Sequence, residues 1–129
     1  MNTLIAQHFD EIEAKLIACP AIISYRVLRR EVSSADGKLR IKATSNDGGM
    51  VELFEYVGEA SGRVHLLKYG FHWQDSHGHL QRRWDNAPHY PALPNAPHHI
   101  HDADGSVRAI ADTPDIFSFI QEIENAITR

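Results

Sequence analysis

Cysteine is nearly absent from this chain of 129 residues, since Cys19 is the only one. A single cysteine excludes an internal disulfide, and its place just before Pro20 suits a small buried apolar residue better than a nucleophile. Long apolar runs are absent too, because none approaches the ~20 residues of a membrane-spanning helix. The N-terminal segment carries Asp10, Glu11 and Glu13, which a secretory signal does not tolerate. We therefore expect a reduced, cytoplasmic protein without a membrane segment.

A basic excess is also lacking. The formal net charge is -4 with histidine neutral, so the chain as a whole does not have the positive charge typical of nucleic-acid-binding domains. Any contact with nucleic acid must therefore be local. The nine histidines make the charge strongly pH-dependent, since an unperturbed histidine titrates near pH ~6.5. The composition, 43% hydrophobic and 23% charged, indicates one globular domain over residues 1–129.

Apolar periodicity predicts a helix at each end of the chain. Over residues 3–17 a stripe at helical spacing consists of Ile5, Phe9, Ile12 and Leu16. The same spacing recurs near the C-terminus at Ile116, Ile120, Ile123 and Ile127. Asn2 or Thr3 can cap the first helix and Pro20 ends it. The second helix opens with a capping hydroxyl, a proline and an acid at Thr113-Pro114-Asp115.

Between the two helices the apolar period changes to two, which is typical of strands. Four turn signals divide this region into five short strands: Asp36-Gly37, Asn46-Asp47-Gly48-Gly49, Gly58 to Gly62, and Ser76-His77-Gly78. The segment SVRAIAD offers one further short strand. We therefore expect an α+β domain, an antiparallel β-meander of five to six strands with the N-terminal and C-terminal helices packed on one face.

A proline-rich segment follows the fifth predicted strand. Its prolines stand three residues apart, at Pro88, Pro91, Pro94 and Pro97, which is the period of a polyproline II rod. In such a rod His89 and His98 would lie ~28 Å apart, unless the chain bends at one of its two Asn-Ala-Pro sequences. The segment also predicts a structural connection to the last helix, in which Tyr90 and Leu93 pack against the body of the protein.

The sequence HHIHDAD at the end of this segment suits a metal. If it is extended, His99 and His101 project to one face. Such a pair could bind a metal ion as two ligands, and Asp85, Asp102 or Asp104 could complete the site. A surface pair without a ligand is the simpler interpretation.

The same region also suits phosphodiester cleavage, which needs a general base, a general acid and cations for the phosphate charge. Arg82 and Arg83 precede Trp84 and Asp85, while His72 and Trp73 lie on the preceding strand. Hairpin register should place His72 near Arg82 and Trp73 opposite Arg82 or Gln81. Such a surface can hold RNA by stacking and phosphate contact.

Structural roles explain several of these residues equally well. Trp73 and Trp84 are typical of a core, and Asp85 can cap the turn at Asn86 and pair with an arginine. Positive charge for RNA could come from further strands, if these present one face, through Lys38, Arg40 and Lys42 together with Arg82 and Arg83.

The sequence from His72 to His101, above all Arg83-Trp84-Asp85-Asn86-Ala87-Pro88-His89, resembles the TumE-like toxins of bacterial toxin–antitoxin systems. The resemblance implies a toxin directed at RNA and a helix-turn-helix antitoxin encoded beside it. Two positions depart from the family pattern: Tyr90 stands where the family usually has a second histidine, and Ile100 where it usually has lysine. The second departure removes one candidate for phosphate binding.

These observations predict a metal-independent endoribonuclease that needs no cofactor. Its candidate catalytic residues are His99 and His101 as acid and base, His89 as a substitute for either, and Asp85 orienting an imidazole. Its candidate substrate-binding residues are Arg82, Arg83, His72 and Trp73. Two alternatives stay open: a metal-binding enzyme or module using Asp85, His99 and His101, and a non-catalytic protein-interaction domain. The sequence is also compatible with a homodimer.

Overall fold

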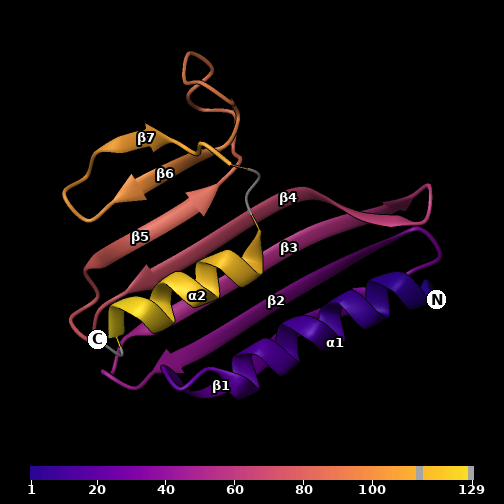
Figure 1. Ribbon diagram of the computed structural model, residues 1–129, viewed down its shortest axis with the longest axis horizontal. Helices are drawn as coiled ribbons and strands as arrows, with labels where there is room; N and C mark the ends of the chain where they lie inside the picture. The colour runs from indigo at the N-terminus through magenta and orange to yellow at the C-terminus, as the bar shows by residue number, and fades with distance from the viewer. Residues whose placement is uncertain (113–114, 128–129) are drawn as a thin grey trace.

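The computed structural model describes residues 1–112 and 115–127. Two helices and seven antiparallel strands follow one another along the chain (Figure 1): α1 (Thr3–Ala18), β1 (Ile22–Val32), β2 (Asp36–Ser45), β3 (Met50–Ala60), β4 (Arg63–Gln74), β5 (Leu80–Asp85), β6 (His99–Asp102), β7 (Val107–Ala109) and α2 (Ile116–Ile127). The strands form one sheet in chain order, β1 to β7. Each strand therefore pairs with its neighbours in the sequence.

Both helices cover the same face of the sheet, as predicted (Figure 1). Their apolar stripes are buried, with Ile5, Phe9, Ile12 and Leu16 from α1 and Ile116, Phe119, Ile120 and Ile123 from α2. Asn2 caps α1, because its side-chain oxygen accepts a hydrogen bond from the Ile5 amide at 3.1 Å. Asp115 caps α2 through the Ser118 amide at 2.8 Å, whereas Thr113 and Pro114 lie outside the described residues. Neither α1 nor α2 has the length and apolar character to span a membrane.

The α+β class is confirmed, but the predicted count of five to six strands is wrong, because the sheet has seven. The additional strand is β6, which pairs with β5 on one side and with β7 on the other. It spans only His99–Asp102. So short a segment, placed directly after a proline-rich stretch, carries too little periodicity to predict a strand by itself.

The first hairpin turn lies before the predicted Asp36-Gly37, because both residues belong to β2 and pair with Gly58 and Val57 of β3. Gly37 is needed for packing, since a Cβ there would stand 2.7 Å from Cγ2 of Ile5 on α1. The glycine therefore serves the contact between helix and sheet.

The predicted polyproline II rod is wrong, because the chain between β5 and β6 folds into successive turns (Figure 1). The alternative of a bend at an Asn-Ala-Pro sequence is confirmed at Asn95-Ala96-Pro97. Three backbone hydrogen bonds of 3.2 Å close these turns, from Leu93 to Tyr90, from Ala96 to Leu93 and from His98 to Asn95. The physical reason is closure: Asp85 and His99 are direct neighbours in the sheet, so the connection must return to where it began.

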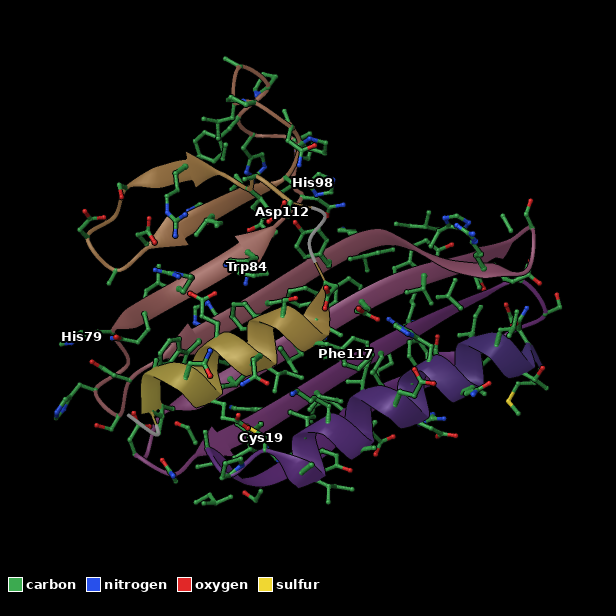
Figure 2. All side chains as sticks on the ribbon, in the orientation of Figure 1. Cys19, His79, Trp84, His98, Asp112 and Phe117 are labelled. Atoms are coloured by element: carbon green, nitrogen blue, oxygen red, sulfur yellow. The ribbon has the colours of Figure 1, made fainter. Side chains whose placement is uncertain are left out.

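Side chains alternate between the two faces of the sheet. The helix-covered face holds the hydrophobic core, and both tryptophans, Trp73 and Trp84, pack against it. Trp84 lies beside α2 (Figure 2), with its ring 5.2 Å from that of Phe119. The core interpretation of the tryptophans is therefore confirmed. The other face, which neither α1 nor α2 covers, is called the open face below.

Candidate functional site

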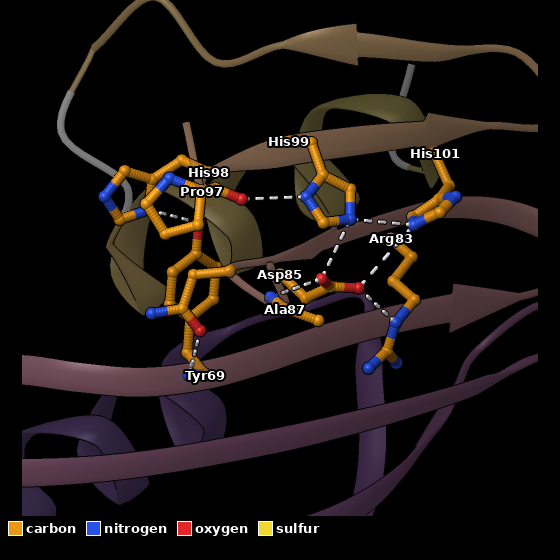
Figure 3. Close-up of polar contacts among 9 residues, drawn as sticks. Tyr69, Arg83, Asp85, Ala87, Pro97, His98, His99 and His101 are labelled. Carbon is orange, nitrogen blue, oxygen red and sulfur yellow. Dashed lines mark hydrogen bonds and ion pairs between the residues drawn. The ribbon is translucent and has the colours of Figure 1, made fainter. Parts of the chain in front are cut away.

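Four predicted site residues come together on the open face, at one end of β5 and β6 (Figure 3). Antiparallel pairing places Asp85 opposite His99 and Arg83 opposite His101. Because alternate residues of a strand share a face, all four side chains point to the same side. These four residues are called the Asp85 cluster below. The predicted shared face of His99 and His101 is confirmed.

Asp85 is the centre of the cluster and is only 6% exposed. Its Oδ1 lies 2.9 Å from Nε2 of His99 and accepts a hydrogen bond of 3.0 Å from the Ala87 amide. Its Oδ2 accepts a hydrogen bond of 2.9 Å from Nε of Arg83 and lies 3.6 Å from Nε2 of His101. Both carboxylate oxygens therefore have partners within the cluster and its adjoining loop. The predicted turn cap and arginine pair are both confirmed.

His99 is the most buried member of the cluster, at 1% exposure. Its Nδ1 lies 2.9 Å from the carbonyl oxygen of Pro97, and since a carbonyl only accepts, Nδ1 must carry a proton. Its Nε2 faces both Asp85 and Nε2 of His101, the latter at 3.1 Å. This nitrogen therefore either donates to Asp85 as part of an imidazolium or offers a lone pair to a cation.

His101 forms the accessible edge of the cluster, with 26% of its side chain exposed. Burial lowers the pKa of its imidazole below the ordinary value, and the charge of Asp85 opposes this effect without cancelling it. A lowered pKa keeps the ring neutral near pH 7. His101 is thus the histidine of the cluster that can accept a proton from a bound molecule.

Arg83 borders a hollow of about 510 Å³ in the open face. Its guanidinium lies over Gly70 of β4, where a Cβ would stand 2.7 Å from Nη2 of Arg83. The walls of the hollow are Arg40, Met50, Glu52, Phe54, Lys68, Tyr69, Gly70, His72, Gln74, Arg83, Asp85 and Ala87. The half-exposed arginine therefore stands between the buried carboxylate and a space that a ligand can enter.

A family model described as toxin TumE matches residues 11–128. The chain belongs to the TumE family. Membership makes it a toxin of a toxin–antitoxin system, with an antitoxin as its partner. No curated protein and no solved structure matches the chain.

In this TumE-family chain, the remaining predicted site residues lie at different distances from the Asp85 cluster. His72 shares the open face and pairs with Arg83 across β4 and β5, while its Nε2 lies 2.9 Å from Oε1 of Gln74. His89 stands on the exposed loop after β5. The Tyr90 ring lies 4.9 Å from that of His99, so the residue that departs from the family pattern covers part of the cluster.

Arg82 and Trp73 are not part of this arrangement. They oppose one another across β4 and β5, as predicted, but on the helix-covered face. There Arg82 pairs with Asp102 at 3.3 Å and also with Glu122 of α2. Asp102 follows His101 directly in β6, so it lies on the opposite face from the two histidines. Among the described residues, only Asp85 joins His99 and His101 as a third ligand candidate.

Two further residues of the site were not found from the sequence. Gly70 makes room for Arg83, and only the pairing register of β4 with β5 reveals it. The hydroxyl of Tyr69 lies 3.1 Å from Nδ1 of His98. Burial, with a further contribution from the charge of Asp85, raises the pKa of Tyr69 above its usual range. No sequence signal marked either residue.

Proposed function

We propose that this TumE-family toxin acts on RNA by cleaving phosphodiester bonds at the Asp85 cluster. The observation that carries the proposal is the chain of contacts from the buried Asp85 through His99 to the accessible His101, with Arg83 alongside. A neutral imidazole backed by a buried carboxylate is suited to proton transfer. A guanidinium at the same point is suited to a phosphate.

In the metal-free form of the reaction, His101 removes the proton of a ribose 2'-hydroxyl, and the 2'-oxygen then attacks the neighbouring phosphorus. Arg83 stabilises the charge on the phosphate oxygens. Asp85 and His99 orient His101. Because the two ring nitrogens are 3.1 Å apart, no phosphate fits between the rings, so both serve the attacking side. We assign the role of general acid to His89, on the exposed loop, which donates a proton to the departing 5'-oxygen.

A metal-assisted reaction is the second candidate, and a specific geometry favours it. One ligand atom each from Asp85, His99 and His101 lies within 4.8 Å of the others. The hydrogen bond from Nδ1 of His99 to Pro97 is the outer contact that commonly orients a metal-binding imidazole. Two nitrogens and one oxygen suit zinc or another transition metal, which would polarise a phosphate oxygen.

Cleavage of a labelled RNA by the purified toxin, with and without EDTA, separates the two candidates. We expect cleavage in EDTA with a bell-shaped pH profile, and a rate lowered by ~10²–10⁴ in His101→Ala. The control is His79→Ala, because His79 is an exposed residue in a turn and its loss should leave the rate unchanged.

Activity that is lost in EDTA and restored by zinc would select the metal-assisted reaction. Cleavage of RNA by His101→Ala at the wild-type rate would contradict both candidates. Tight binding of the antitoxin with no RNA cleavage under either condition would instead favour an interaction domain without catalysis.

The partner and the place of action follow from the same proposal. The resemblance described above supports a helix-turn-helix antitoxin encoded beside the toxin. An RNA target places the action in the cytoplasm. Expression of the neighbouring reading frame with the toxin, followed by co-purification, tests the partner directly.

A further inference from the structure

Positive charge is concentrated on the open face, although the chain is acidic overall. Strand register places eight cations there: Arg26, Arg29, Lys38, Arg40, Lys42, Arg63, Lys68 and Arg83. The acids of the same face are Glu31, Asp36, Glu52 and Asp85. This face therefore carries a formal charge of +4. The other five cations and 13 carboxylates of the sequence make the remainder -8.

Several of these cations are available to an anion. The ion pairs of the open face use Arg29, Arg40 and Arg83. Arg26, Lys42 and Lys68 are exposed, and within the part of the chain that the structure describes no carboxylate lies within ion-pair distance of them. Their charges can thus be neutralised by phosphates, with release of counterions.

Two aromatic rings lie among the cations. Phe54 and Tyr56 are neighbours on the open face of β3 and are partly exposed. The guanidinium of Arg40 stands 4.6 Å from the Phe54 ring, and the ammonium of Lys38 stands 5.5 Å from the Tyr56 ring. Aromatic rings next to cations are the usual platforms for unpaired bases.

The aromatic and basic residues lead directly to the Asp85 cluster. Pairing register forms one row of neighbours across five strands, which runs through Arg40, Phe54, Gly70, Asp85 and His99. With strands spaced ~4.8 Å apart, this row spans roughly 19 Å. The hollow beside Arg83 lies along it, and at Gly70 the row is covered by the guanidinium of Arg83.

We propose that single-stranded RNA lies across the open face along this row, with a base on Phe54, phosphates near Arg40 and Lys68, and the scissile phosphate at Arg83. This inference rests on the proposed function and adds the class of substrate and the surface that holds it. Unpaired bases are required because a ring on a sheet can stack only on a base that is not already stacked in a duplex.

The test measures binding of a fluorescent single-stranded RNA of about 12 nucleotides. The 2'-oxygens of this RNA are methylated, so that binding is measured without cleavage. The test variant is Arg40→Gln combined with Lys68→Gln. The matched control is Lys15→Gln combined with Arg108→Gln, which removes the same charge from outside the open face. Melting curves confirm that each protein is folded.

We expect the test variant to bind at least tenfold more weakly and to lose roughly 1.4 units of the log–log salt slope, about 0.7 for each phosphate contact. The control should bind like the wild type. Phe54→Leu should weaken binding about tenfold by loss of stacking, with little change in the salt slope. A duplex of the same sequence should bind less tightly than the single strand.

Equal weakening in the control and the test variant, or tighter binding of the duplex, would overturn the inference. So would variants that bind RNA normally but fail to bind the antitoxin, because the open face would then be a protein-docking surface. RNA binding on this face without cleavage of unmodified RNA would refute the proposed function, and with it the scissile position at Arg83, while the open face would remain the surface that binds single-stranded RNA.

Discussion

Replacement of Asp85 by asparagine tests the structural basis of the site. The carboxylate accepts hydrogen bonds on both oxygens, from the Ala87 amide on Oδ1 and from Arg83 on Oδ2. Asparagine has a single acceptor oxygen, so its amide NH₂ must face a donor on one side or the other. The variant therefore loses one buried hydrogen bond and the negative charge beside His99.

The size of the effect follows from burial. A hydrogen bond to a charged group contributes ~1.5–3 kcal/mol, and the pair with Arg83 adds ~1 kcal/mol or less because 39% of the arginine side chain is exposed. We expect Asp85→Asn to lower the free energy of unfolding by about 2–3 kcal/mol. For a domain of this length that corresponds to a melting temperature roughly 8–12 °C lower.

Asp102→Asn is the matched control, because Asp102 also pairs with two arginines, Arg82 and Arg108. The side chain of Asp102 is 20% exposed and that of Arg108 is 50% exposed. Asp102→Asn should therefore lower the free energy of unfolding by ~1 kcal/mol or less. Thermal melts followed by circular dichroism in EDTA provide the comparison. If Asp85→Asn melts no lower than Asp102→Asn, the Asp85 cluster does not stabilise the fold as argued.

Zinc that raises the melting temperature of the wild type but not of Asp85→Asn would support the metal-assisted candidate.

Two other predictions concern stability. Burial is the largest cause of the lowered pKa of both His98 and His101, so these two side chains bind fewer protons in the folded chain than in the unfolded chain as the pH falls through ~6.5. Their contribution should make the urea midpoint lower at about pH 5.5 than at about pH 7.5, and an equal or higher midpoint would contradict the assignment. Gly37→Ala should cost ~1–3 kcal/mol by overpacking, because its Cβ would meet Cγ2 of Ile5 at 2.7 Å and the carbonyl oxygen of Glu31 at 2.9 Å. Gly58→Ala is its control, since the nearest atom there is the mobile end of the exposed Leu67 at 3.1 Å, and equal destabilisation of the two variants in urea unfolding would refute the packing argument.

Local patterns predicted much of the secondary structure and part of the site. The stripe that begins at Ile5 and Phe9 needed only the helical period, and it is buried as expected. The His-x-His spacing placed His99 and His101 on one face, because any extended segment does so. The turn between β4 and β5 also determined the register well enough to predict that Trp73 opposes Arg82 or Gln81, and its partner is Arg82.

The sequence by itself thus determined every element except β6, the antiparallel order and the pairs of residues that share a face, since these depend on the backbone period and on short turns. Tertiary structure alone decided which face the helices cover, and so put Arg83 with the histidines and Arg82 with α2. It also decided that the proline-rich connection turns back, because β6 pairs beside β5. Both outcomes depend on contacts between distant segments, which compete across the whole chain and leave no local periodicity.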